Sequence, residues 1–172
     1  AYLYEVVLVA LYLFWRDRPR MKRLAWGFFA VNVAGIVTYL AYPAAPPWYV
    51  EAYGLGPARL DAPPSAAGAA RFDELLGISY FKAFYSRNAN VFGAMPSLHV
   101  AYPVLVLCAT ARLGAVWVGT TGAFALLVAF AAVHLRHHYV WDVVVGAIYG
   151  GTTHALVWLY HRWRSGQSRQ RG

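Results

Sequence analysis

Three long apolar runs limit what this chain can fold into. They cover residues 24–42, 115–133 and 141–160, and shorter apolar runs cover residues 2–15 and 99–111. A helix needs about 20 apolar residues to cross the hydrocarbon of a bilayer. Charged residues make up 13% of the chain and hydrophobic residues 60%, a share of charge too low for an ordinary water-soluble surface. We therefore predict an all-α, polytopic transmembrane bundle with five visible spans.

Basic residues indicate how these spans are oriented. The net charge is +8, and many of the cations lie in two groups beside apolar runs: Arg16, Arg18, Arg20, Lys22 and Arg23, and Arg162, Arg164, Arg169 and Arg171. Such groups can bind nucleic acid, but next to apolar runs they favour cytoplasmic loops, and we expect no nucleic-acid partner. Residues 43–97 then lie outside the cell and residues 162–172 form a cytoplasmic tail.

This topology has consequences for the whole chain. Five spans that begin outside suggest a sixth helix before Ala1. We expect residues 1–172 to form a single membrane-embedded catalytic domain in the plasma membrane. No pattern in the sequence predicts an oligomeric state.

The segment between the second and third spans has two parts. Residues 43–64 are rich in Pro, Gly and Ala, which predicts an irregular loop. Residues 71–85 carry one apolar helical stripe, which predicts an amphipathic helix lying on the outer leaflet; its members are Phe72, Leu75, Leu76, Tyr80 and Phe84. A helix packed on the bundle would have the same pattern, so both interpretations stay open.

Ionisable residues gather at one level of the predicted bundle. They lie at the outer ends of their spans, where a charge near lipid is costly and indicates a function; they are His99, His134, Arg136, His137, His138 and Asp142. His138 and Asp142 are four residues apart and share one helical face. A carboxylate there can accept the Nδ1 proton of the imidazole and leave Nε2 free as a nucleophile. A structural helix cap is the alternative for this pair.

The helix ends predict what the site binds. Ser97 is a suitable N-cap before His99, and the spans that begin near His99 and Asp142 both run inward. Their N-termini then form an anion site on the outer side, where a phosphate would lie between His99 and His138. One imidazole can attack phosphorus while the other protonates the leaving oxygen. Arg136 and Arg87 are candidates to bind the phosphate oxygens, although Arg136 could instead anchor the protein to lipid headgroups.

These motifs resemble the type 2 phosphatidic acid phosphatase superfamily. The elements that carry the resemblance are Pro96-Ser97-Leu98-His99 and His138-Tyr139-Val140-Trp141-Asp142. Within this superfamily the motif sequences are most similar to those of the inositol phosphorylceramide synthase branch. The similar segments are Ala45-Pro46-Pro47-Trp48-Tyr49, residues 92–99 and His137-His138-Tyr139.

The resemblance implies a six-helix bundle and a metal-independent phosphohistidine mechanism without a cofactor. It implies that His138 is the nucleophile, Asp142 its orienting carboxylate and His99 the general acid and base. The Lys-x6-Arg-Pro element and the Ser-Arg pair of that superfamily are missing, the latter near Ala131-Ala132. Phosphate binding must therefore use other groups, and Arg136, Arg87 and Arg59 are the candidates.

Further residues are assigned by their position. Trp48 and Tyr49 either line the headgroup site or anchor the loop at the interface, and we place His137 and Ser97 in the phosphate site. Adjacent His137 and His138 point apart on a helix, which argues against a zinc site. Gly146 and Gly150 form a flat strip on which another helix can pack closely.

The predicted function is a lipid phosphotransferase or lipid phosphate phosphatase. Its substrate would be a phospholipid, an inositol-phosphate lipid or a polyprenyl-phosphate, and its partners membrane lipids. The motifs do not distinguish water from an alcohol as the acceptor. A membrane haem carrier with His99 and His138 as ligands, and a proton-relay transporter, are the alternatives.

Overall fold

The computed structural model describes residues 2–87 and 90–170, and its long elements are all α-helices. An isolated bridge joins Ala44 to Gly93, and the described residues contain no β-strand. In chain order the elements are α1 (Tyr2–Arg16), α2 (Arg18–Ala41), α3 (Pro47–Tyr53), η1 (Ala67–Ala69), α4 (Ala70–Leu76), α5 (Tyr80–Tyr85), α6 (Leu98–Thr110), η2 (Ala111–Leu113), α7 (Ala115–His134) and α8 (Val140–Gln170). The predicted all-α class is confirmed.

Within residues 2–87 and 90–170, three helices are long and apolar enough to cross a membrane. They are α2, α7 and the part of α8 up to Gln167, and the shorter apolar segment Leu98–Leu113 lies among them. Large apolar side chains such as Leu40 on α2 and Leu126 on α7 are 80% and 74% exposed, which a water-soluble bundle would not favour. Lipid is the environment that fits this surface, and the chain is a polytopic membrane protein. The number of spans, five or six, stays a prediction.

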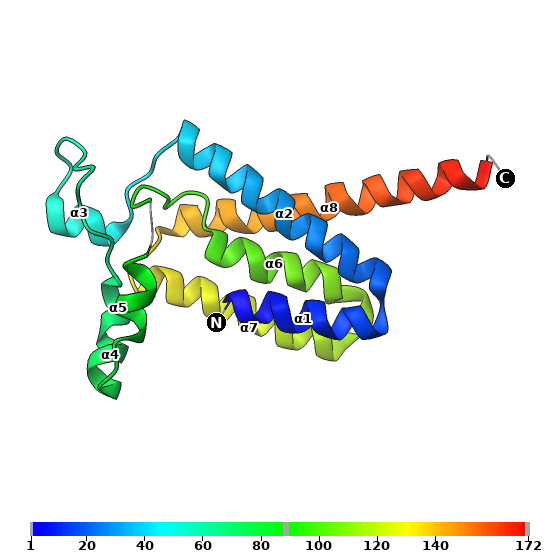
Figure 1. Ribbon diagram of the computed structural model, residues 1–172, viewed down its shortest axis with the longest axis horizontal. Coiled ribbons are helices and arrows are strands. Elements are labelled where there is room, and N and C mark those ends of the chain that lie inside the picture. The colour runs from blue at the N-terminus through cyan, green and yellow to red at the C-terminus, as the bar shows by residue number, and fades with distance from the viewer. Residues whose placement is uncertain (1, 88–89, 171–172) are drawn as a thin grey trace.

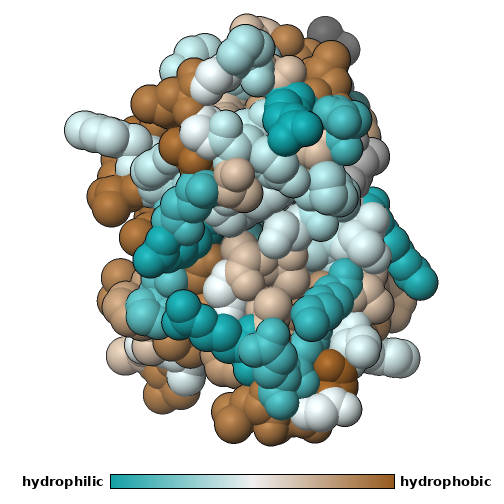
Figure 2. Space-filling model, turned by 90° about the vertical axis from the view of Figure 1, so that its left-hand side faces the viewer, coloured by the Kyte–Doolittle hydropathy of each residue, from teal (hydrophilic) through white to brown (hydrophobic). Residues whose placement is uncertain are grey.

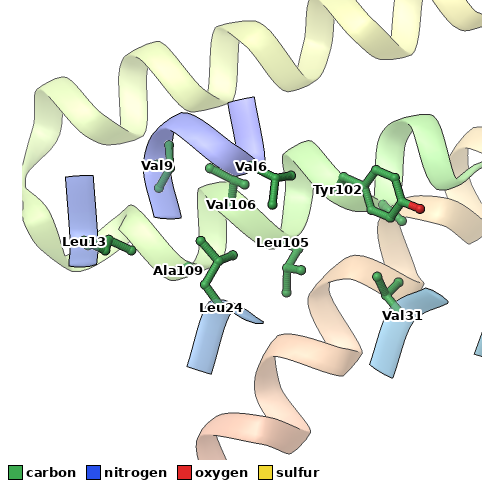
Figure 3. Packing of buried hydrophobic residues seen from close by; sticks show 10 residues of the cluster. Val6, Val9, Leu13, Leu24, Val31, Tyr102, Leu105, Val106 and Ala109 are labelled. Carbon is green, nitrogen blue, oxygen red and sulfur yellow. The ribbon is translucent and has the colours of Figure 1, made fainter. Parts of the chain in front are cut away.

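Helix α6 lies at the centre of the bundle and packs against α1, α2, α7 and α8 (Figure 1). Its side chains Leu105 and Val106 are fully buried. Figure 3 shows them meeting Val6 and Val9 from α1 and Val31 from α2. A helix enclosed on all sides is apolar on all faces, which explains why α6 lacks an amphipathic pattern.

Helix α8 approaches α6 very closely at two glycines. A Cβ on Gly146 would lie 2.3 Å from the carbonyl oxygen of Ser97, and one on Gly150 would lie 2.4 Å from that of Ala101. Any side chain at these positions would overlap the backbone of α6. The close packing predicted for the Gly146–Gly150 strip is confirmed, and it sets the spacing between the helices that carry His99 and Asp142.

The segment between α2 and α6 crosses one end of the bundle. The irregular loop predicted over residues 43–64 contains the short helix α3. The single helix predicted over residues 71–85 is two helices, α4 and α5, because Gly77 adopts a left-handed φ of 63° between them. The buried Asp73 carboxylate accepts hydrogen bonds from the backbone N–H groups of Phe81 and Lys82, at 2.9 and 2.8 Å. These N–H groups lie in the first turn of α5, so Asp73 stabilises the start of this helix.

The two ends of the bundle differ. The N-termini of α6 and α8 lie at the end that carries α3, α4 and α5, and the α1–α2 turn with its basic residues lies at the other end (Figure 1). Figure 2 shows the first of these ends, with hydrophilic side chains across the face and hydrophobic ones around its edges. The apolar residues of the predicted stripe remain exposed there, from Phe84 at 43% to Leu75 at 80%. Arg171 of the predicted basic tail lies outside the described residues.

Candidate active site

The turn between α7 and α8 positions both adjacent histidines. The carbonyl oxygen of Ala132, near the end of α7, accepts hydrogen bonds from the backbone N–H groups of His137 and His138, each at 3.1 Å. Arg136 precedes them with a left-handed φ of 62°, which is uncommon for a residue with a side chain. Its carbonyl oxygen accepts a hydrogen bond from the backbone of Trp48, at 3.2 Å. This turn directs the side chain of His138 into the bundle, where it is buried.

His138 and His99 form a direct hydrogen bond. Nε2 of His138 lies 2.9 Å from Nδ1 of His99, and Nδ1 of His138 lies 2.7 Å from the carbonyl oxygen of Ala94. A carbonyl oxygen can only accept, so the Nδ1–H of His138 donates to it. In the neutral imidazole, Nε2 of His138 then carries a lone pair and accepts the Nδ1–H of His99. In this tautomer the lone pair lies on the nitrogen predicted to be the nucleophile.

Asp142 has two contacts at the start of α8. Its Oδ2 accepts a hydrogen bond from the backbone N–H of Tyr139 at 2.7 Å and lies 3.8 Å from Nδ1 of His138. The direct acceptor of the Nδ1 proton is therefore the carbonyl of Ala94, whereas the sequence pattern suggested the carboxylate. Asp142 is both a helix cap and a buried negative charge beside His138. At this distance a carboxylate would stabilise a positive charge on the His138 ring.

Ala94 has this role because two distant loop segments pair with each other. The backbone N–H of Ala44 donates to Phe92 at 2.9 Å, and that of Ala94 donates to Ala44 at 3.1 Å. The pairing holds the segment before α6 against the segment after α2. Sequence reasoning missed Ala94 because a backbone carbonyl leaves no signal in the residue type.

Ser97 joins the start of α6 to α8. Its backbone N–H donates to the carbonyl oxygen of Asp142 at 2.9 Å, and it occupies the N-cap position of α6 without a side-chain cap bond. Three buried side-chain atoms around the histidine pair have no hydrogen-bond partner among the described residues: Oγ of Ser97, Nε2 of His99 and Nε2 of His137. Buried polar atoms are usually paired, so this group marks a place that can receive a polar ligand.

The two histidines line a cavity of about 490 Å³. Its walls are mainly aromatic and its cation is Arg87; besides these it is lined by Tyr2, Leu3, Tyr39, Phe84, Tyr85, Asn90, Gly93, Leu98 and Tyr102. A cavity with apolar walls, one guanidinium and two imidazoles suits an amphiphile with a phosphate group. The tyrosines of this wall were not predicted; the high aromatic content, 17% of the chain, was the only signal and had been assigned to the membrane interface.

The other predicted cations lie away from this cavity. The side chain of Arg136 forms an ion pair with Glu51 and is 55% exposed. The guanidinium of Arg59 lies 5.2 Å from the ring centre of Tyr53. Among the described arginines, Arg87 alone lines the cavity that holds both histidines. The charge pattern favoured Arg136 as the phosphate-binding residue. The position of the side chains favours Arg87 instead.

The two residues of the Trp-Tyr pair have different surroundings. Trp48 lines a small cavity of about 60 Å³ that shares His99 and His138 with the large one. Tyr49 is buried among aromatic rings, and its hydroxyl accepts a hydrogen bond from the backbone of Arg59 at 2.7 Å. Tyr49 supports the α3 loop, and only Trp48 is close enough to the histidine pair to contact a ligand.

His137 lines the same small cavity and stacks on Tyr85 at 4.5 Å between ring centres. Burial, and the repulsion that a protonated His138 beside it would exert, lower the pKa of His137 to about 4. His137 is therefore neutral at physiological pH and can offer a hydrogen bond, not a charge, to a ligand. In the described part of the chain, His, Cys, Asp and Glu side chains form no group of three or more suited to hold a metal ion.

The fold and the site define a class: an integral membrane helix bundle with a hydrogen-bonded pair of histidines, buried His138 and half-buried His99, that faces an apolar-walled cavity. The sequence profile of the PAP2 superfamily matches residues 1–156, and the chain belongs to this family. No solved structure matches the chain.

Curated relatives refine this placement. The chain is 41% identical over 136 residues to a phosphoinositol dihydroceramide synthase of Bacteroides thetaiotaomicron, a match that covers 77% of the chain and 44% of the relative. It is 33% identical over 149 residues to an inositol phosphorylceramide synthase of Candida albicans, covering 84% of the chain and 31% of the relative. A third relative is the catalytic subunit of the Saccharomyces cerevisiae inositol phosphorylceramide synthase. It is 34% identical over 122 residues, a match that covers 69% of the chain and 29% of the relative. The chain spans less than half the length of each.

Proposed function

We propose that this chain is the catalytic membrane domain of a phosphotransferase that moves a phosphoinositol group from a lipid phosphodiester to the hydroxyl of a ceramide-class lipid. The observation that carries the proposal is the contact of 2.9 Å between Nε2 of His138 and Nδ1 of His99 at the wall of a cavity of about 490 Å³. The family and the names of the relatives favour an enzyme over the haem-carrier and transporter alternatives.

The first step forms a phosphohistidine. The lone pair on Nε2 of His138 attacks phosphorus and forms a P–N bond, and the P–O bond to the lipid alcohol breaks. His99 acts here in its imidazolium form, which the anionic phosphodiester favours. Its Nδ1–H, directed at His138 before substrate binds, passes to the leaving oxygen once phosphorus lies between the rings, and His99 is left as a neutral imidazole. His138 becomes a cation, which the Ala94 carbonyl and the Asp142 carboxylate stabilise. Arg87 binds the phosphate oxygens.

The second step releases the product and returns the enzyme to its first state. Nδ1 of His99 takes the proton of the acceptor hydroxyl, the acceptor oxygen attacks phosphorus, and the P–N bond to His138 breaks. Water in place of the alcohol would give a phosphatase. The aromatic walls of the cavity favour a lipid alcohol, because apolar side chains such as Phe84 and Leu98 stabilise an acyl chain there and do not bind water.

The site faces the extracytoplasmic side of the plasma membrane in this proposal. The support is the distribution of charge: basic residues between α1 and α2 and at the end of α8 lie at the opposite end of the bundle from the histidines. Positively charged loops remain preferentially in the cytoplasm.

A transfer assay tests the proposed function. The protein in detergent micelles is given an inositol-labelled phosphatidylinositol and a short-chain ceramide, and lipid products are separated by chromatography. We expect label to appear in a lipid that forms only when ceramide is present. Release of labelled inositol phosphate at the same rate with and without ceramide would instead identify a lipid hydrolase.

We predict that Arg87→Gln lowers kcat/KM by about 10- to 100-fold, because one charge-assisted hydrogen bond to a phosphate contributes about 1.5–3 kcal/mol. Arg71→Gln, which removes an exposed cation from α4, is the matched control and should change kcat/KM by less than twofold. Arg136→Gln should have a smaller effect than Arg87→Gln, since its partner is Glu51. A larger loss in Arg136→Gln would contradict the assignment of the phosphate to Arg87.

A further inference from the structure

A second polar cavity lies at the opposite end of the bundle from the histidine pair. It has a volume of about 230 Å³ and lies between α2, the end of α6 with η2, and α8. Its charged, imidazole and indole side chains are Arg20 and Arg23 from α2, Arg112 from η2, and His154 and Trp158 from α8. Three guanidinium groups from two separate parts of the chain therefore meet at one cavity.

The positive charge of this cavity is only partly balanced. In the part of the chain that the structure describes, Asp17 is the one acidic residue that forms an ion pair with one of these arginines, at 3.3 Å between its Oδ2 and Nε of Arg20. Nη1 of Arg20 is buried and has no hydrogen-bond partner among the described residues. Arg23 and Arg112 both act electrostatically on His154, so their charges converge on the same place. A buried, unpaired guanidinium nitrogen is costly unless an anion binds to it.

Trp158 extends the cavity towards the end of α8. The guanidinium groups of Arg112 and Arg162 lie 5.4 and 5.2 Å from its ring centre. The same side chain lines an adjoining cavity of about 420 Å³ together with Arg23, Arg162 and His161. Tryptophan and arginine side chains in contact are typical of the level of lipid headgroups.

We propose that this cavity binds the phosphate of an anionic phospholipid in the leaflet opposite the histidine pair. An orientation signal alone requires only exposed cations, and Lys22 and Arg164 are of that kind. A cavity between membrane helices, with converging arginines and a buried N–H that lacks an acceptor, is instead suited to a headgroup phosphate. The exposed apolar surface beside it, which includes Leu156 and Leu159 on α8, would contact the acyl chains.

Binding of short-chain lipids to the purified chain in neutral detergent tests this site. The probes are dioctanoyl phosphatidylglycerol, dioctanoyl phosphatidylcholine and inorganic phosphate, each titrated by calorimetry. We expect phosphatidylglycerol to bind at least tenfold more tightly than the other two. Binding of inorganic phosphate as tight as that of phosphatidylglycerol would assign the cavity to a soluble anion and overturn the lipid proposal, as would equal binding of phosphatidylcholine.

Variants locate the binding in this cavity. Arg23→Gln combined with Arg112→Gln should weaken phosphatidylglycerol binding at least tenfold, and Lys22→Gln, which removes an exposed neighbouring charge, should change it less than twofold. Arg23→Lys combined with Arg112→Lys keeps the charge and should retain the affinity to within about threefold, which also covers the case that the glutamine variant does not fold. Equal losses in the glutamine and lysine variants, equal loss in Lys22→Gln, or no loss in the glutamine variant would each overturn the proposal.

Discussion

Replacing His138 with Asn should lower the rate of the proposed phosphoinositol transfer by about 10³-fold or more, because loss of the proposed nucleophile removes the covalent route altogether. Asn can keep a hydrogen bond to the carbonyl of Ala94, which now accepts the Nδ1–H of His138 at 2.7 Å. The packing around this buried position is therefore disturbed little, and the loss should lie in the chemical step and not in folding. The transfer assay described above measures the rate.

The intermediate gives a second measurement of the same variant. With the lipid donor and no acceptor, the wild-type chain should gain the mass of one phosphoinositol group, localised to His138 by peptide mass spectrometry under alkaline conditions. His138→Asn should gain none. His134→Asn is the matched control, because His134 is exposed on α7, where it stacks on Phe130 at 5.3 Å, and it should label like the wild type. A His138→Asn variant that still transfers within tenfold of the wild-type rate would rule out the phosphohistidine.

Gly150→Ala should lower the free energy of unfolding by about 1–3 kcal/mol, the usual cost of overpacking a close contact. The added Cβ would lie 2.4 Å from the carbonyl oxygen of Ala101, and backbone cannot move aside as a side-chain end can. Helices α6 and α8 would have to separate. Because α6 carries His99 and α8 begins with the Asp142 cap, we also expect a loss of activity.

The neighbouring glycine provides the control for this prediction. A Cβ on Gly151 meets nothing within 4 Å, although the residue lies on the same helix. Gly151→Ala should leave stability unchanged or raise it by up to about 1 kcal/mol, since Ala favours a helix more than Gly does. Denaturant unfolding of both variants in detergent measures the difference. Equal stabilities would show that the close approach of α6 and α8 does not stabilise the bundle.

Two structural details could not be predicted from residue type. Residues 71–85 have one helical stripe, but the stripe does not reveal that Gly77 adopts a left-handed conformation and divides it into α4 and α5. The charge pattern favoured Arg136 for phosphate, yet its side chain pairs with Glu51, which lies 85 residues earlier. The Arg136 pairing depends on a contact between distant parts of the chain, about which a local pattern holds no information. The break at Gly77 rests on nearby contacts, those of the Asp73 carboxylate with the backbone of Phe81 and Lys82, which a stripe of apolar residues does not record.

Some features of the site could be predicted from the sequence, and others required the tertiary structure. The sequence by itself determined the all-α membrane class and the gathering of His99, His138 and Asp142 at one end of the bundle. Hydropathy and helical spacing are local properties of the chain, so they can be recognised without the tertiary structure. Only the tertiary structure decided that Ala94 accepts the Nδ1 proton of His138, that Arg87 lines the cavity, and that tyrosines form its wall. These depend on how the loop after α2 folds across the ends of α6 and α8, and long-range packing sets that path.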